Sequence, residues 1–420
     1  MGDVDLSFNL LLSAFLLIVM IRWRSPLILF GAQFALGSLF RSDSDSIMVN
    51  VGWFLALLTI SLAYRRNGIR LDCYQISYRP VPRIRWLIFI GFFFVLMLLW
   101  LQEAGITAFD SSKRTSTAGA FTNLFSGLLN LYFALALAVL MFYRRGQPKW
   151  LLWFSVAIFL VFALKAYLGS NRGVVALPVF LVLFCRFAQV RRFSHFVRFV
   201  ATAIVFGGLG LRMILVTTAE RAGVDLQTGL FLLRSQLAGY LGNGYSPLRD
   251  QAILEYVQSF GTFIPPITIF APIYGFIPRV LWPGKPDVGV GRIVGEDVFN
   301  TGGGYNDRGA GIPISVPAEM EAIFGHGGFW IGLFFVVLLM VFLGRKCLRH
   351  PALILPIMLI APSMMGSDFG RLGMLFIILS VSLLLCDKFL GVGVTSFQRS
   401  ASQFGGAGWK RGKRSVRLRF

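Results

Sequence analysis

The chain has 420 residues, of which 56% are hydrophobic and only 14% are charged, and its formal net charge is +21. This composition excludes a soluble globular domain, because apolar segments of about 17 to 25 residues, each long enough to cross a bilayer, recur along the whole length. The positive charge does not predict a nucleic-acid partner. It gathers in short segments between apolar runs and near the carboxyl end, as in loops that face an anionic leaflet.

The apolar runs predict an all-α polytopic membrane protein of about eleven transmembrane helices. The expected spans are residues 6–21, 26–40, 47–64, 86–102, 121–143, 150–168, 174–187, 199–217, 318–343, 351–366 and 371–387. The chain therefore divides into amino-terminal helices (1–216), a connection of about a hundred residues with no long uninterrupted apolar run (217–314), carboxy-terminal helices (315–390) and a basic tail (391–420).

The basic residues predict the orientation of these spans. They concentrate in every second connection: after spans 6–21, 47–64, 121–143, 174–187 and 318–343, and in the tail. Such segments remain in the cytoplasm, by the positive-inside rule. We therefore expect the amino terminus and residues 217–314 on the outer side of the membrane. The tail is expected in the cytoplasm, on the inner membrane surface.

The connection 217–314 is predicted to be folded and to carry function. A loop of this length in a compact protein is usually a lid or a binding surface when it is not disordered. Its aromatic residues and the apolar stretch 260–277 argue against disorder, although eight of the twenty-five residues in 287–311 are glycine. Four prolines interrupt residues 259–280 and disfavour a straight helix there, so we expect surface-lying or re-entrant short helices.

Several ionisable residues fall at the outer ends of predicted spans, where charge is costly and indicates function. Arg172 and Arg371 each lie in a short glycine-flanked turn between two helices. The planar guanidinium group suits phosphate oxygens, so two arginines facing one cavity would bind a diphosphate without a metal. His326, between glycines, is a candidate general base or a helix cap.

Cysteine and histidine residues predict neither a disulfide nor a metal site. All four cysteines lie in or beside segments expected in the cytoplasm, and the three histidines are far apart in the chain. We therefore expect no metal and no cofactor.

Four motifs in the second half of the chain resemble the Wzy-type polymerases of O-antigen and exopolysaccharide repeat units. Residues 278–286 (PRVLWPGKP) are similar to their PR-x-LWP-x-KP signature, and residues 169–173 (GSNRG) to their GSRG turn, with Asn171 inserted. Residues 315–319 (SVPAE), followed by 324–328 (FGHGG), resemble their S-x-x-x-E and FG-x-x-G helix start. Phe369-Gly370-Arg371 looks like their late arginine.

The resemblance implies a GT-C-like, metal-independent glycosyltransferase of the bacterial inner membrane. Its substrate would be an oligosaccharide on undecaprenyl diphosphate, transferred to a sugar hydroxyl of a second lipid-linked unit. A chain-length regulator would be a protein partner. Glu319 or His326 would assist the acceptor, and Arg172 and Arg371 would hold the diphosphate. The glycan would be bound by the loop residues Arg279, Trp282, Arg292 and Arg308.

Two rival functions stay open at this point. An O-antigen ligase shares the fold but transfers the glycan to lipid A core or to a protein. A flippase or transporter would use the same cationic cavity without making a bond, although such proteins more often show inverted repeats or broken helix pairs.

Overall fold

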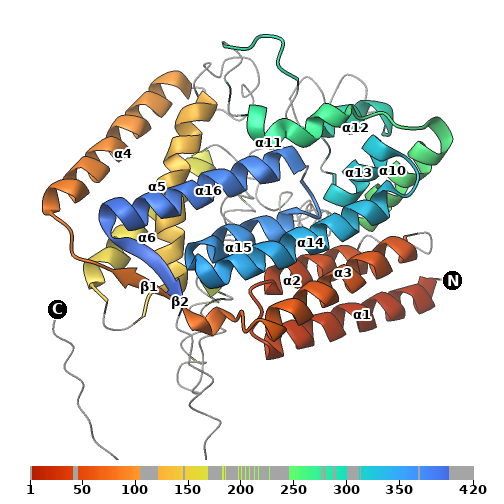
Figure 1. Ribbon diagram of the computed structural model, residues 1–420, viewed down its shortest axis with the longest axis horizontal. Coiled ribbons are helices and arrows are strands. Elements are labelled where there is room, and N and C mark those ends of the chain that lie inside the picture. The colour runs from red at the N-terminus through yellow and green to blue at the C-terminus, as the bar shows by residue number, and fades with distance from the viewer. Residues whose placement is uncertain are drawn as a thin grey trace, which may run out of the picture.

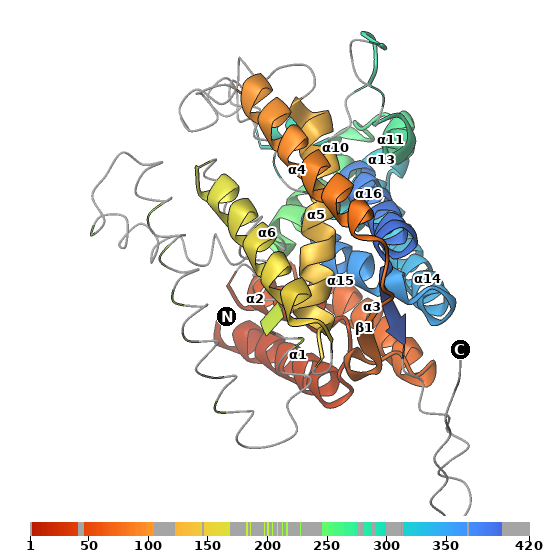
Figure 2. The same ribbon diagram turned by 90° about the vertical axis from the view of Figure 1, so that its left-hand side faces the viewer.

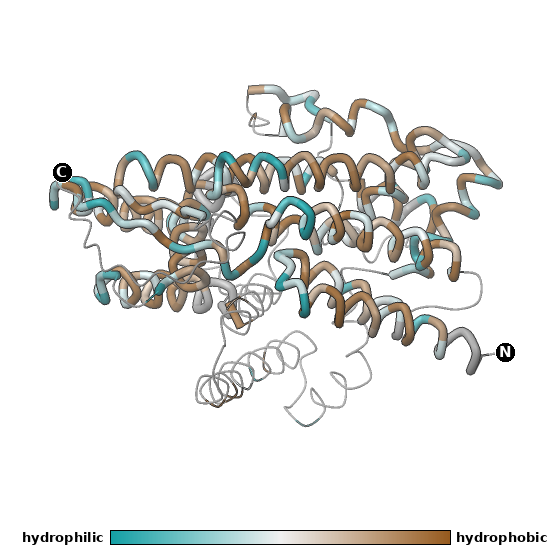
Figure 3. The backbone as a smooth tube through the Cα atoms, turned by 60° about the horizontal axis from the view of Figure 1, so that its bottom comes forward, coloured by the Kyte–Doolittle hydropathy of each residue, from teal (hydrophilic) through white to brown (hydrophobic). Residues whose placement is uncertain are grey.

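The structure is a computed structural model of the chain and is mostly helical. It describes residues 2–40, 46–104, 122–144, 147–168, 246–275, 281–286, 290–299, 314–367 and 369–396, with isolated positions between them. Hydrophobic residues occupy much of the length of the long helices (Figure 3). Within the described residues, four segments are long and apolar enough to cross a membrane: Ile47–Cys73, Arg83–Gln102, Gly328–Arg349 and Phe369–Leu390. The fold is therefore that of a helical membrane protein.

The first three helices pack together as a group (Figure 1). They are α1 (Gly2–Arg22), α2 (Ile28–Phe40) and α3 (Ile47–Arg66). Two buried polar pairs join them: the hydroxyl groups of Ser13 and Ser38 are 2.9 Å apart, and the amide of Asn50 donates to that of Asn9 over 3.3 Å. Each polar group is thus satisfied inside an apolar bundle, as a membrane environment requires.

A second group of helices surrounds α5. These are α4 (Arg83–Ala104), α5 (Thr122–Phe142) and α6 (Lys149–Leu168). Figure 2 shows α5 with α4 and α6 beside it, and α5 also contacts α16. The hydroxyl group of Tyr132 in α5 donates to the carbonyl of Phe89 in α4 over 2.8 Å.

The carboxy-terminal helices differ from the predicted spans. The expected span 318–343 is two helices, α13 (Val316–Phe324) and α14 (Gly328–Arg349). The break occurs because Gly325 and Gly327 have φ values of 83° and 92°, which lie in the left-handed region. The expected span 351–366 holds a 3-10 turn, η6 (Pro351–Leu353), and only ten residues of α-helix in α15 (Ile354–Ser363). The last long helix is α16 (Phe369–Leu390).

Close glycine contacts hold α3 against α14. A Cβ added at Gly52 would lie 2.8 Å from Leu333, and one at Gly344 would lie 2.6 Å from the ring of Tyr64. The hydroxyl group of Tyr64 donates to the carbonyl of Met340 over 2.9 Å. Small residues that allow such approach are characteristic of helix packing in membranes.

The structure also contains strands, which the all-α prediction missed. A 3-10 turn, η1 (Leu71–Cys73), leads into β1 (Tyr74–Tyr78), which pairs antiparallel with β2 (Val392–Ser396). Tyr74 is opposite Ser396, and Tyr78 is opposite Val392. The first residues of the predicted tail thus belong to the folded part of the chain, since 391–394 are buried and Val392–Ser396 pair with β1.

The basic connections that follow α1 and α3, and the one between β1 and α4, lie together with β2 at one end of the helices. Next to the strand pair, the Leu71 N–H donates to the Arg24 carbonyl over 3.0 Å, and the Arg79 N–H donates to the Gly391 carbonyl over 2.8 Å. The guanidinium of Arg65 lies 4.6 Å from the ring centroid of Trp23. These contacts place the basic connections that they involve on the same side. That this side faces the cytoplasm stays a prediction.

Part of the connection 217–314 is described, and it contains the short helices that were expected. They are α10 (Pro247–Phe260), the 3-10 helix η4 (Pro266–Phe270), α11 (Ala271–Tyr274) and α12 (Gly291–Asp297). Buried residues of α10, α12 and α13 form a small hydrophobic cluster of their own. Proline lies in the first turn of α10, η4 and α11, where its missing N–H would have no intrahelical partner, and α10 ends just before Gly261, whose φ is 84°.

Candidate functional site

The short helix α13 is the centre of the candidate site. Ser315 begins it, because its side chain accepts the Ala318 N–H over 3.2 Å and Pro317 favours the first turn. Every residue from Val316 to Ile323 is buried, including two glutamates. Carboxylates that are fully buried need strong partners, so the partners of these two indicate what the helix does.

Both glutamates bind the amino terminus of another helix. One carboxylate oxygen (Oε2) of Glu319 accepts the backbone N–H of Phe369, at the start of α16, over 2.6 Å. The Oε2 atom of Glu321 accepts the N–H of Phe329, at the start of α14, over 2.6 Å. The first N–H groups of a helix lack intrahelical partners and carry partial positive charge, which stabilises a carboxylate there. α13 thus fixes the starts of α14 and α16.

A third buried carboxylate ties α13 to α10. The hydroxyl group of Ser315 donates to Oδ2 of Asp250 over 2.7 Å, and Asp250 is 0% exposed. Burial raises the pKa of Asp250 to about 6, against smaller opposing contributions from Arg249, Ser315 and Trp53. Because Trp53 belongs to α3, this cluster also joins the connection 217–314 to the amino-terminal helices.

The structure brings together some of the residues that the sequence singled out. Arg371 lies in the first turn of α16, two residues after Phe369, and its side chain is exposed. The helix start that Glu319 holds is therefore the one that carries Arg371. His326 is exposed in the turn between α13 and α14. Arg172, Arg279 and Arg308, and the side chain of Arg292 on α12, lie outside the described residues.

The tryptophan-proline motif forms a turn that closes on itself. Trp282 is 40% exposed and packs edge-on against Tyr274 of α11, with ring centroids 6.2 Å apart. The Lys285 N–H donates to the Trp282 carbonyl over 3.1 Å. The ammonium group of Lys285 is directed inward and donates to the carbonyls of Ile277 over 2.6 Å and Gly275 over 3.3 Å. This role of Lys285 was not predicted, although the Pro-Gly pair before it is a turn signal in the sequence.

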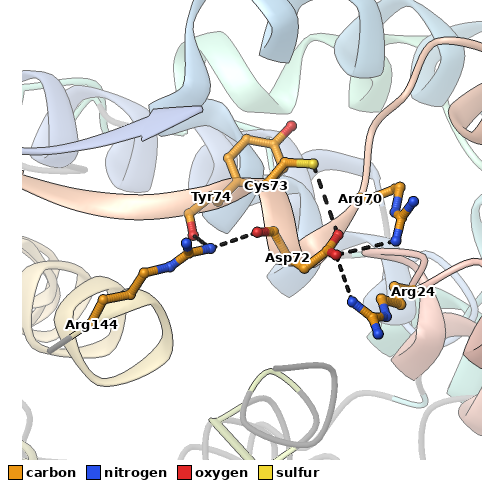
Figure 4. A network of polar contacts seen from close by, with 6 residues as sticks. All are labelled: Arg24, Arg70, Asp72, Cys73, Tyr74 and Arg144. Carbon is orange, nitrogen blue, oxygen red and sulfur yellow. Dashed lines mark hydrogen bonds and ion pairs between the residues drawn. The ribbon is translucent and has the colours of Figure 1, made fainter. Parts of the chain in front are cut away.

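A separate polar cluster lies beside the strand pair, at the opposite end of α3 (Figure 4). Oδ2 of Asp72 accepts from Arg24 over 2.6 Å and from Arg70 over 3.1 Å. The guanidinium of Arg144 donates to the backbone carbonyls of Asp72 over 2.5 Å and Tyr74 over 3.2 Å. These contacts link α1, β1 and the end of α5. The cluster therefore joins the basic connections to one another, and we assign it a structural role.

Over the part of the chain that the structure describes, there is no group of three His, Cys, Asp or Glu residues that could hold a metal ion.

Comparison with known proteins adds no assignment. No protein-family model, no curated protein and no solved structure matches the chain.

Proposed function

We propose that this chain is a membrane glycosyltransferase that joins oligosaccharide repeat units carried on undecaprenyl diphosphate into a longer polysaccharide. In the reaction, the bond between the donor sugar and its diphosphate breaks, and the acceptor hydroxyl oxygen forms the new glycosidic bond. The hydroxyl proton passes to a base, and the lipid diphosphate leaves with the negative charge. The demands on the protein are thus a cationic site for the leaving group and a group that orients the acceptor.

The observation that carries the proposal is the junction of α13 with α16. The S-x-x-x-E motif supplies Glu319, and the late arginine motif supplies Arg371, which lies two residues beyond the N–H that Glu319 binds. Two motifs that are 50 residues apart in the chain therefore meet at one place. They meet at the end of α16 away from the basic connections, which is the side predicted to face outward. This is where a polymerase would receive units that have already crossed the membrane.

The burial of the candidate side chains favours different roles for them. Arg371 is exposed, which favours contact with a diphosphate, with Arg172 as its proposed partner. His326 is exposed and accessible to an acceptor hydroxyl, which favours it as the base. Glu319 is 1% exposed and bound to the start of α16, which favours a positioning role. Trp282 is 40% exposed, which favours stacking of a sugar ring on its indole.

The test is the length of glycan on the lipid carrier in cells that carry Arg371→Lys or Arg371→Ala. Loss of one charge-assisted contact to the leaving group should cost about 2–4 kcal/mol, or roughly a hundredfold in rate, and lysine should not restore it. The matched control is Arg345→Lys, an exposed arginine near the opposite end of α14. Long chains of normal length from both Arg371 variants at equal membrane abundance would remove Arg371 from the site.

A deletion strain separates the proposed function from its rivals. Single repeat units should accumulate on the outer face of the membrane. A flippase would instead leave them on the inner face, and a ligase would leave long chains that are not transferred to their final acceptor. Activity of the purified protein should survive a chelator, because the proposed chemistry uses arginines in place of a metal.

A further inference from the structure

The segment between α10 and the tryptophan-proline turn has an unusual surface. We call it the apolar arm, and it consists of η4, α11 and the turn 281–285. Between Glu255 and Arg279 the sequence contains no charged residue. Prolines at 265, 266 and 272 limit the arm to short helices. Its length and shape therefore do not suit a transmembrane span, although its composition is as apolar as one.

Large hydrophobic side chains of the arm project outward. Phe270 is 59% exposed, Ile273 is 72% exposed and Leu281 is 77% exposed. Ile267 at 46% and Trp282 at 40% extend the same surface. A soluble surface rarely gathers so many large apolar groups, and such a patch indicates a binding surface for another apolar partner.

The position of the arm on α16 indicates what that partner is. Pro272 of α11 contacts Gly373, and Gly275 contacts the sulfur of Met374, so α11 lies beside the first turns of α16 (Figure 1). The same stripe of α16 then continues, at helical spacing, through the exposed residues Ile377, Val381 and Leu384. Because α16 is apolar enough to cross a membrane, we infer that the exposed stripe faces lipid. The arm lies at the amino-terminal end of this stripe.

The inward direction of Lys285 fits this environment. Its side chain is 8% exposed and donates to two carbonyls at the end of α11. A carbonyl without a partner is costly in hydrocarbon, since no water is present to bind it. The ammonium group donates a hydrogen bond to both carbonyls. Its charge is therefore buried inside the arm and is not on the arm's outer surface.

We propose that the apolar arm is embedded in the bilayer at the amino-terminal end of α16, with Phe270, Ile273 and Leu281 among the lipid acyl chains and Trp282 near the headgroups. The arm is then a monotopic anchor that holds α10 and α12 against the membrane surface. Short amphipathic helices of this kind sit about 5–10 Å into the boundary between headgroups and acyl chains. Tryptophan is enriched at that boundary. This inference does not depend on the proposed glycosyl transfer.

The test uses single added cysteines that carry a fluorescent label, in full-length protein reconstituted into phosphatidylcholine–phosphatidylglycerol vesicles. Ile273→Cys reports on the arm, and Glu255→Cys, on the exposed face of α10, is the control. The label at 273 should lose fluorescence when the acyl chains are brominated and should resist quenching by aqueous iodide. The label at 255 should show the reverse. The native chain, in which Cys73 is half-buried and the other three cysteines are buried, supplies the background.

Two results would overturn the inference. Equal quenching of both labels by iodide would place the arm in water. Shielding of the label at 273 from both quenchers, with energy transfer between labelled copies, would mean that a second copy of the chain covers the arm. Leu281→Cys provides a second position in case the first variant does not fold, and it should respond as the label at 273 does.

Discussion

Replacing Glu319 separates a positioning role from a catalytic one. Its carboxylate is buried and accepts the Phe369 N–H over 2.6 Å at the start of α16. In Glu319→Ala this charge-assisted hydrogen bond is lost, which should destabilise the fold by about 1.5–3 kcal/mol. Glu319→Gln retains an acceptor oxygen and loses mainly the interaction of the charge with the helix terminus. That loss should destabilise the fold by about 0.3–1 kcal/mol, and by ~2 kcal/mol at most.

The assay is reversible unfolding of the purified protein in mixed micelles, followed by the loss of helical circular dichroism. The alanine variant should shift the unfolding equilibrium by roughly ten- to a hundredfold, and the glutamine variant by much less. Glu255→Gln, on an exposed carboxylate of α10, is the control and should change nothing. Polymer length is measured on the same variants. An unfolding equilibrium of Glu319→Ala equal to that of the native protein would refute the structural reasoning. Loss of polymer in a Glu319→Gln variant of native stability would show that the carboxylate is catalytic.

Three further predictions concern the arm and its surroundings. Burial raises the pKa of Asp250 to about 6, so its protonated form favours the folded state. The free energy of unfolding should therefore fall by about 2 kcal/mol as the pH rises from about 4 to 6, and Asp250→Asn should remove this slope in unfolding measured across that range. Lys285→Met leaves the carbonyls of Gly275 and Ile277 without their donor, so amide hydrogen exchange over 271–285 should accelerate. Lys388→Met, at an exposed lysine, is the control and should leave that exchange unchanged. Gly373→Ala places a methyl group against the rigid ring of Pro272 and should loosen α11 in the same exchange experiment, while Gly91→Ala, with open space around it, should not.

Helices bounded by strong local signals could be predicted from the sequence. The expected span 47–64 corresponds to α3 at Ile47–Arg66, and 86–102 to α4 at Arg83–Ala104, because an apolar run ends at charged residues in both cases. The span 318–343 was wrong because hydropathy averaging passes over Gly325 and Gly327, although paired glycines around a histidine are a visible break signal.

Contacts between distant segments could not be predicted. Strand β1 has the alternating, aromatic character of a strand, but nothing local identifies Val392–Ser396 as its partner. Similarly, Glu319 is recognisable as a motif residue, while its bond to Phe369 depends on how α13 and α16 pack. The inward direction of Lys285 has the same origin, since a lysine is by default expected at the surface.

The pairing of β1 with β2 has a consequence for how the chain is made. Tyr74 leaves the ribosome early, whereas its partner Ser396 is synthesised 322 residues later (396 minus 74). At about 5–20 residues per second, the edge of β1 that pairs with β2 waits roughly 15–60 s for its partner. During that interval it is a template for unwanted pairing with other chains. The contacts of Arg144 with Asp72 and Tyr74 form from a segment made much sooner, and they hold β1 in place while its edge is still open.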